Sequence, residues 1–341
     1  MALLEGVSQP TLAGERNRWI RFFKKYVHTI KNAIALSSFL RDQSTYDLLL
    51  IPTTWTPHVL MLLPLMVFRK DKVKAIRLQF LCCWDVNSIK SRCALRILRI
   101  ILICANCIHK DIGLFGQTLL VCDDIKGDSA LNVTWMPDVA HPVEKTYKKK
   151  IYQSDQPLLF GFYGFARHEQ GSDILQEAIK EFLKENSDLN VQFHIFWSSG
   201  GFYTPTGLWV EPDITLEKTG KVNFYREFIS DDQYLSLLGK TDWIILPYLK
   251  ESYQRRSSRV AVDAIIRGIP AIYTQETFLE ELFSKYGEGI ALSNNQAFDL
   301  AKALHDAYYH YSGRKSQPIQ KKMNHLEVFT PEYFWKKLFN Y

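Results

Sequence analysis

Apolar and polar positions follow two alternating patterns along this chain of 341 residues. Short apolar runs bounded by Gly, Pro or Asp predict buried strands, and segments with apolar residues three or four positions apart predict helices. Strands and helices follow one another repeatedly, which predicts a parallel sheet covered by helices. The predicted strands are 48–51, 74–81, 119–122, 133–136, 158–163, 190–197, 222–224, 243–246, 289–292 and one that begins at 271. The predicted helices are 15–40, 59–68, 93–109, 174–184, 230–238, 260–267, 277–285, 295–311 and 331–341.

One long polar segment interrupts this rhythm. Residues 138–157 are rich in charge and contain prolines, and a clear strand–helix order begins again after them. The chain is also long enough for two domains of about 100–200 residues each. We therefore expect an α/β protein with an N-terminal domain over 1–140, a linker over 141–157, a second domain over 158–311 and a C-terminal helical tail over 312–341.

The charge of the chain is unevenly distributed. Residues 1–150 carry a charge of +10 and residues 151–341 carry −4, which gives the net charge of +6. A basic half is consistent with an anionic partner, such as a membrane surface or a phosphorylated acceptor, or with a solvated basic face. The helix predicted at 15–31 has an apolar face opposite Arg18, Arg21, Lys24 and Lys25. Such a helix can lie on an anionic membrane or pack on a sheet.

Composition narrows the class of protein further. Apolar residues make up 47% of the chain and no low-complexity segment is present, which excludes a disordered protein. The pair Cys104-x-x-Cys107 has no second pair at metal-ligand spacing, so no metal site is predicted. The apolar runs at 47–68 and 97–108 contain prolines or are too short to span a bilayer, which needs about 20 residues. Without a signal-peptide pattern, we expect a cytoplasmic protein, in peripheral contact with the inner face of the membrane through residues 15–31, and no nucleic-acid partner.

The richest chemistry lies between the strand predicted at 243–246 and the helix predicted at 260–267. A helix N-terminus attracts anions, and guanidinium groups and hydroxyls placed there bind phosphate. Asp263, inside the helix, can accept hydrogen bonds from sugar hydroxyls. The segment therefore predicts a nucleotide bound through its diphosphate. The donors of the loop are Tyr253, Gln254, Arg255, Arg256, Ser257, Ser258 and Arg259.

Three segments together resemble the GT-B nucleotide-sugar glycosyltransferases, in particular the C-terminal domain of the retaining group 1 type. They are VTWMPDV at 133–139, FYGFARHEQGSDIL at 162–175, and the stretch 253–270 with its final GIP. The resemblance extends over about residues 130–292. It implies two Rossmann-like domains facing each other across a cleft, a nucleotide-sugar donor, and hexosyl transfer without a metal cofactor.

The resemblance also implies roles for individual residues. Arg256 becomes a catalytic group on the leaving diphosphate. Asp85 is either a catalytic residue facing the cleft or an ordinary loop or cap aspartate. The donor-binding residues are Gly164, Arg167, His168, Tyr253, Ser257, Ser258 and Asp263, of which Asp263 contacts the ribose. The pattern departs from the family at Phe165 and Gln170, where an Arg and a Lys are expected, and at Arg255, where an acid is expected.

The predicted function is transfer of a sugar to a glycan or lipid-linked acceptor, as in surface polysaccharide or glycolipid synthesis. The N-terminal domain is shorter than the family's usual one. Two alternatives stay open, namely a sugar-nucleotide epimerase of the same fold and a non-catalytic GT-B module that binds a partner or the donor. The sequence leaves the donor base, the sugar and the linkage undetermined.

Overall fold

The structure, a computed structural model, divides the chain into two compact units. The first unit comprises Met1–Pro137 with Trp335–Tyr341, and the second comprises Asp138–Phe334. Each unit contains a parallel sheet of its own. The described residues are 31, 48–51, 77–82, 96, 100, 112–129, 133–143, 156–197, 200–313 and 325–339.

The first unit is built on a parallel sheet. Its described strands are hydrogen-bonded in the order β1-β2-β3-β4, and Leu48 of β1 lies opposite Arg77 of β2. Helix α5 (Leu119–Ser129) connects β3 to β4. The strands are β1 (Leu48–Ile51), β2 (Arg77–Cys82), β3 (Ile112–Gly116) and β4 (Thr134–Trp135).

The strand predicted at 119–122 is wrong, because these residues begin helix α5. The preceding run IGLFG forms β3 instead, and the chain turns at Gln117 and Thr118. The Thr118 hydroxyl accepts a hydrogen bond from the backbone N–H of Val121, which satisfies a donor in the first turn of the helix. Val121 and Ile125 are buried at helical spacing, so the apolar run covers a helix face.

The second unit contains a larger parallel sheet. Its described strands are hydrogen-bonded in the order β12-β11-β10-β5-β6-β9. The five residues of β5 and the four of β10 are all buried, as expected for strands covered on both faces. The strands are β5 (Leu158–Phe162), β6 (Val191–Phe196), β9 (Val222–Tyr225), β10 (Trp243–Leu246), β11 (Ala271–Thr274) and β12 (Gly289–Leu292).

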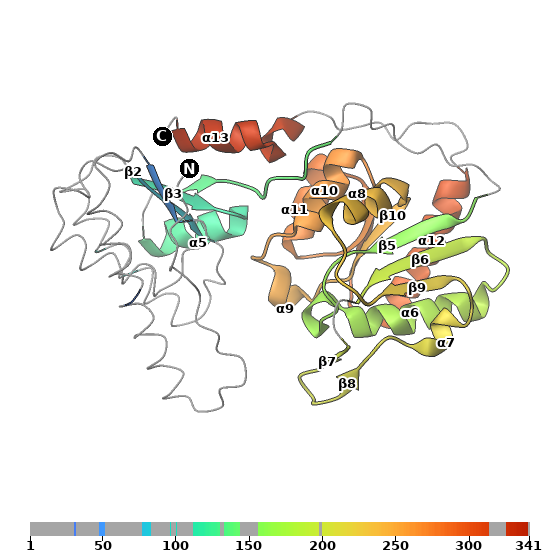
Figure 1. Cartoon of the computed structure of the whole chain (residues 1–341). Coiled ribbons are helices and arrows are strands. Elements are labelled where there is room, and N and C mark those ends of the chain that lie inside the picture. The colour runs from blue at the N-terminus through green and yellow to red at the C-terminus, as the bar shows by residue number, and fades with distance from the viewer. Residues whose placement is uncertain are drawn as a thin grey trace. The chain divides into compact units, whose positions relative to one another are not determined.

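Helices cover both faces of this sheet (Figure 1). Connections between parallel strands are right-handed. The chain adds strands toward β9 in its first half and toward β12 in its second half, so the helices of the two halves lie on opposite faces of the sheet. Helices α6 and α12 pack together on one face, and α8, α10 and α11 lie on the other. The helices of this unit are α6 (Ser172–Glu185), α8 (Asp231–Lys240), α10 (Arg259–Arg267), α11 (Phe278–Tyr286) and α12 (Ala297–Gly313), with short turns at α7 (Ile214–Glu217), α9 (Lys250–Tyr253), η1 (His168–Gln170) and η2 (Leu326–Phe329). Helix α13 (Pro331–Phe339) begins in the second unit and continues into the first, which includes Trp335–Tyr341.

Side chains fix where several of these helices begin. Ser230 and Gln233 form a capping box at the start of α8, and Thr277 caps α11 by accepting from the Leu279 N–H. Gly268 ends α10 in the left-handed conformation, with φ of 65°. The helix starts predicted from the sequence therefore coincide with local hydrogen-bonding signals.

The sequence pattern missed a small hairpin between β6 and β9. Strands β7 (Phe202–Tyr203) and β8 (Trp209–Val210) pair in antiparallel fashion, and α7 follows them. Each strand has two residues, which is too short for a periodic pattern to be recognised. The hairpin stands out from the rest of the second unit in Figure 1.

Several predictions concern residues outside the described ranges. These include Asp85, the Cys104–Cys107 pair, the helix at 59–68 and most of the helices at 15–40 and 93–109. Of these two helices the structure describes Lys31, Arg96 and Ile100, each in helical conformation and exposed. The domain boundaries at 140 and 158 stay predictions, because 144–155 are also outside. Among the described residues, no helix combines the length and apolar character needed to cross a bilayer.

Candidate functional site

The sheet of the second unit has one point where the chain changes direction. From β5 the chain proceeds through β6 and β9 to one edge, and from β10 it proceeds through β11 and β12 to the other. Strands β5 and β10 are neighbours, with Trp243 opposite Phe160. In parallel α/β sheets, ligands bind beyond the carboxyl ends of the strands at such a switch point. The loops that follow β5 and β10 therefore form the candidate site.

These two loops are locked together by their backbones. The N–H of Leu249 donates to the carbonyl oxygen of Glu169 over 3.0 Å. Gly171 adopts φ of 70°, and a Cβ at this position would collide with the carbonyl oxygen of Pro247. A glycine is therefore required where the loop after β5 passes the loop after β10.

Two arginines, one from each loop, converge on a single carboxylate oxygen. Nη1 of Arg167 lies 3.7 Å and Nη1 of Arg256 lies 3.8 Å from Oε1 of Glu169. Each guanidinium also rests on an aromatic ring, Arg167 on Phe165 at 5.1 Å and Arg256 on Tyr253 at 5.9 Å. The guanidinium groups are about half exposed, so they can exchange the carboxylate for an anionic ligand.

A buried neutral pair lies beside the arginines. Gln170 donates through Nε2 to the hydroxyl of Tyr253 over 2.9 Å, and its own Oε1 is buried without a hydrogen-bond partner. That oxygen faces Gly164, where any side chain would collide with the amide. Burial raises the pKa of Tyr253, while the Gln170 hydrogen bond and the charges of Arg256 and Arg167 oppose the rise. Gly164, predicted from the sequence, thus belongs to the tight turn of this site.

The predicted serines have partners within the protein. The Ser258 hydroxyl caps α10 by accepting from the Ala261 N–H over 3.4 Å, and it lies 3.4 Å from the Tyr248 hydroxyl. Ser257 hydrogen-bonds the side chain of Asp138. Burial raises the pKa of Asp138, and the Ser257 hydrogen bond and the charge of Arg259 partly offset the rise. The serines shape the start of α10, and phosphate contact by either one stays a prediction.

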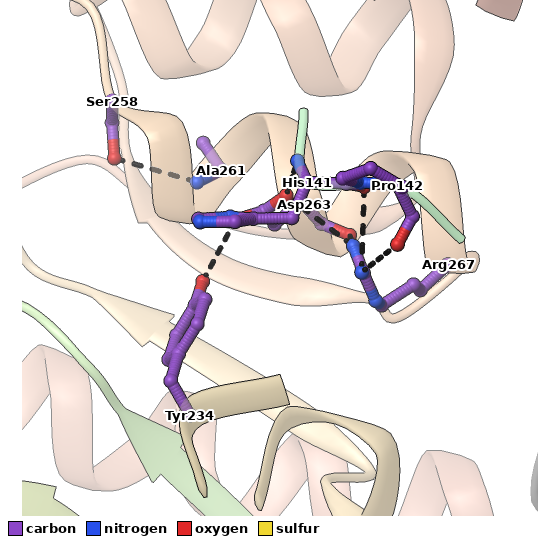
Figure 2. Close-up of polar contacts among 7 residues, drawn as sticks. All are labelled: His141, Pro142, Tyr234, Ser258, Ala261, Asp263 and Arg267. Atoms are coloured by element: carbon purple, nitrogen blue, oxygen red, sulfur yellow. Dashed lines mark hydrogen bonds and ion pairs between the residues drawn. The ribbon is translucent and has the colours of Figure 1, made fainter. Parts of the chain in front are cut away.

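Asp263 occupies a different environment from the one expected. Its side chain is fully buried and accepts hydrogen bonds from several directions (Figure 2). Oδ1 lies 2.7 Å from the His141 N–H and 3.3 Å from Nη1 of Arg267, and Oδ2 lies 2.7 Å from Nδ1 of His141 and 3.0 Å from the Tyr234 hydroxyl. We refer to Asp263, His141, Tyr234 and Arg267 as the Asp263 cluster.

The Asp263 cluster fastens the segment at 141–142 to helices α8 and α10. Arg267 extends it by donating to the carbonyl oxygens of His141 and Pro142, as Figure 2 shows. Burial raises the pKa of Tyr234, and the negative charge of Asp263 raises it further, so this hydroxyl remains a donor. The Asp263 oxygens already accept hydrogen bonds from the protein, and the ribose contact stays a prediction.

Sequence reasoning missed most of the residues that surround these groups. His141 falls in the predicted linker and lies 122 positions from Asp263. No local pattern marks His141 or Tyr234 as a partner of Asp263, or Glu169 as a partner of Arg256, because each of these contacts joins distant segments. His168, predicted near the donor, lies in the turn before α6 with Nδ1 3.0 Å from Asp173 Oδ2. Asp85 lies outside the described ranges.

The described part of the chain contains no group of three or more His, Cys, Asp or Glu side chains arranged to hold a metal ion. The donor set of the switch point consists instead of guanidinium, amide and hydroxyl groups. Such groups bind phosphate and sugar oxygens through hydrogen bonds and charge. A requirement for a metal cofactor is not predicted from the sequence and stays outside the proposal below.

Comparison with known proteins places this architecture among solved structures. The chain matches a sucrose-phosphate synthase from Thermosynechococcus elongatus with a TM-score of 0.62 and 13% identity, over 93% of this chain and 80% of that one. It matches a UDP-forming trehalose-phosphate synthase from Burkholderia xenovorans, solved with glucose-6-phosphate, with a TM-score of 0.61 and 12% identity, over 96% and 79%. The catalytic domain of starch synthase IV from Arabidopsis thaliana, bound to ADP and acarbose, gives 0.57 and 12%, over 93% and 76%.

These structures are GT-B glycosyltransferases, and the likeness extends over most of the chain. No known family profile matches the sequence, and no curated protein matches it by sequence. At such low identity the likeness establishes the fold. The predicted α/β fold of the GT-B type is therefore confirmed.

Proposed function

We propose that this protein is a glycosyltransferase that moves a hexosyl group from a nucleotide-diphosphate donor to an acceptor. The observation that carries the proposal is the convergence of Arg167 and Arg256 at the switch point between β5 and β10. Two fixed positive charges beyond the carboxyl ends of parallel strands suit a diphosphate. The neighbours with this fold include a UDP-forming synthase and a synthase bound to ADP.

The proposed chemistry follows from where charge develops. When the anomeric C–O bond of the donor breaks, negative charge grows on the leaving diphosphate, and positive groups already in place lower the energy of that state. Arg167 and Arg256 supply these groups, held by the stacked rings of Phe165 and Tyr253. Gly164 leaves room for the buried Gln170 amide, which holds the Tyr253 hydroxyl beneath Arg256.

Glu169 places a negative charge between the two arginines before the donor binds. Its carboxylate shares one oxygen between the two guanidinium groups at 3.7 and 3.8 Å, beyond normal hydrogen-bond length. Ion pairs this exposed contribute at most about 1 kcal/mol. A diphosphate carries more charge than one carboxylate and can displace it, so Glu169 keeps the arginines in place until the donor arrives.

The stereochemical outcome, the acceptor and the membrane contact are proposed from the sequence. We propose a retaining hexosyltransferase whose acceptor is a glycan or a lipid-linked sugar in surface polysaccharide or glycolipid synthesis. The +10 charge of residues 1–150 supports contact with anionic membrane at its inner face, through residues 15–31. The predicted cytoplasmic location is part of the same proposal.

A non-catalytic GT-B module is a second candidate, and particular residues favour it. Phe165 and Gln170 are neutral at the turn after β5, and Asp263 is committed to protein donors. Such a site can bind a nucleotide diphosphate without turning over a sugar. Nucleotide binding without any release of UDP, GDP or ADP from the matching nucleotide-glucose donors, in the presence of sugar acceptors, would identify the module.

Calorimetry with UDP, GDP and ADP tests the site, because its variants should change nucleotide affinity in opposite directions. Arg256→Ala and Arg167→Ala should each weaken binding about ten- to hundred-fold, since a lost charged partner of phosphate costs about 1.5–3 kcal/mol. Glu169→Gln should tighten binding by up to about fivefold, because it removes a competing negative charge.

A matched control is available at the far edge of the sheet. Arg226 is 48% exposed, close to the 50% of Arg256, and it is ion-paired with Glu217 over 2.7 Å. Arg226→Ala should leave the affinity unchanged. If the wild-type chain bound none of the nucleotides, or if Arg226→Ala weakened binding as much as Arg256→Ala, the switch point would not be the donor site.

A further inference from the structure

The hairpin of β7 and β8 presents an uncharged aromatic surface to solvent. Residues 200–210 contain no Asp, Glu, Lys, Arg or His, in a chain of which 23% is charged. Tyr203, Leu208 and Trp209 are 69%, 64% and 46% exposed. Large apolar side chains gathered on a projecting element mark a binding surface rather than scattered exposure. We refer to these three residues as the hairpin tip.

The hairpin tip is held rigid by its own hydrogen bonds. The Thr204 N–H donates to the Leu208 carbonyl over 2.8 Å, and the Gly207 N–H donates to the Thr204 carbonyl over 3.0 Å. The Thr204 hydroxyl also accepts from the Leu208 N–H. Gly207 supplies the left-handed turn residue, with φ of 85°. A surface ordered before binding loses little entropy when a ligand arrives.

The aromatic rings are positioned by a glycine. A Cβ at Gly201 would lie 2.5 Å from Cζ2 of Trp209, so the absence of a side chain lets the indole lie against the backbone. The rings of Trp209 and Tyr203 are 4.8 Å apart between centroids and tilted by 59°. Together they form an angled pair of ring faces. The negative π-face of such a ring attracts polarised C–H groups on the apolar side of a sugar ring.

The hairpin, like the switch-point loops, follows the carboxyl end of a parallel strand, since β7 comes after β6 in the chain. The segment after the hairpin is fastened to Gln176, which donates to the Glu211 carbonyl over 3.1 Å and accepts from the Asp213 N–H over 2.7 Å. Gln176 lies in the second turn of α6, and this helix begins beyond the carboxyl end of β5. The hairpin and the candidate donor site therefore share one end of the second unit.

We propose that the hairpin tip binds a neutral carbohydrate chain, such as the growing glycan that receives the sugar. Charge decides between the candidate partners. The tip carries no cation to hold an anionic membrane, and the segment that follows it is nearly balanced, with Glu211, Asp213 and Glu217 against Lys218 and Lys221. Two further cations beside that segment, Lys180 and Arg226, are ion-paired with Asp213 and Glu217. An uncharged partner with hydroxyls and C–H faces fits this surface, whereas anionic lipid would find no cation on the tip.

The choice of a glycan rests on the proposed function, but saccharide binding and nucleotide binding are measured separately, so either proposal can fail alone. The full chain is titrated with neutral gluco-, galacto- and manno-oligosaccharides, and binding is followed by tryptophan fluorescence and by saturation-transfer NMR. Trp209→Ala and Tyr203→Ala should each weaken binding about tenfold or more, and Trp209→Phe, which keeps an aromatic ring, should weaken it less. Calorimetry with UDP, GDP and ADP should give wild-type affinity for all three variants.

Tyr309→Ala is the matched control. Tyr309 is 51% exposed and lies near the carboxyl end of α12, far along the chain from the hairpin. Its loss should leave saccharide binding unchanged. Circular dichroism of each variant confirms that the fold is retained.

Each outcome either supports or overturns glycan binding by the hairpin tip. Saccharide binding that depends on Trp209 supports the inference, even if no nucleotide binds and the proposed transferase function fails. Nucleotide binding without saccharide binding overturns the inference and leaves the transferase proposal in place. Loss of vesicle binding to phosphatidylcholine, or loss of self-association in sedimentation, on Trp209→Ala without any saccharide binding would also overturn it.

Discussion

At the scale of single residues, Asp263 shows how far a side chain's chemistry depends on distant partners. Its place within α10 is typical of an acid that can contact a ribose, yet its oxygens accept from His141, Tyr234 and Arg267. A buried carboxylate is stable only when its lone pairs are satisfied in this way. The sequence does not indicate this structural role, because two of the donors, His141 and Tyr234, come from distant segments, and only Arg267 lies on the same helix.

The Asp263 cluster should therefore contribute strongly to stability. Asp263→Ala leaves Arg267 as a buried charge without its carboxylate, and we expect a loss of about 3–5 kcal/mol in the free energy of unfolding. Tyr234→Phe removes one donor and should cost about 1–3 kcal/mol, which keeps the test valid if Asp263→Ala does not fold. Urea denaturation measures both values.

Asp188→Ala provides the comparison for the Asp263 cluster. Asp188 is exposed in the turn between α6 and β6, and its substitution should change stability by less than about 0.5 kcal/mol. A Tyr234→Phe variant as stable as the wild type, together with an Asp263→Ala variant no less stable than Asp188→Ala, would contradict a structural role for the cluster.

At the scale of elements, the candidate site depends on how two loops pass each other. Gly171 has φ of 70° and faces the Pro247 carbonyl, whereas Gly220 has φ of 72° and open space where a Cβ would lie. Gly220→Ala should lose only the cost of left-handed backbone for a residue with a Cβ, about 1–2 kcal/mol. Comparing Gly171→Ala with Gly220→Ala therefore distinguishes the cost of backbone strain from the cost of disturbing the contact between the loops.

Gly171→Ala should lose this same amount and, in addition, push the loops after β5 and β10 apart. We expect it to be less stable than Gly220→Ala by about 1–3 kcal/mol and to bind UDP, GDP or ADP more weakly, because Arg167 and Arg256 no longer converge. Urea denaturation and calorimetry of the two variants give the comparison. Equal stability and equal nucleotide affinity would show that the loop contact does not hold the arginines.

Element prediction succeeded where hydrophobic pattern and local hydrogen bonding agree. Strands β10 and β12 have the predicted bounds, and α8 and α11 begin one residue after the predicted starts at 230 and 277, where Ser230 and Thr277 cap them. It failed at 119–122, where apolar residues form a helix face, and at the β7–β8 hairpin, whose strands are too short for periodicity. Short apolar runs are ambiguous between strand and helix until their neighbours in space are known.

At the scale of the whole molecule, the site comes from chain topology. Residues 164–171 and 253–258 are adjacent because β5 and β10 pair at the switch point, although they are far apart in sequence. The sequence identified Arg167, Arg256, Tyr253 and Gly164 as candidates by resemblance. It could not identify Glu169 as a partner of Arg256 or Gln170 as a partner of Tyr253, since the paired strands bring these groups together. The fold itself is confirmed by GT-B glycosyltransferases at 12–13% identity.

A crystal structure of the protein with UDP, GDP or ADP tests the central claim most directly. We predict that the diphosphate lies beyond the carboxyl ends of β5 and β10, with its oxygens in hydrogen-bond contact with the guanidinium groups of Arg167 and Arg256. Glu169 should have moved away from both arginines. A diphosphate bound elsewhere on the chain, with Glu169 still between the two arginines, would contradict the claim.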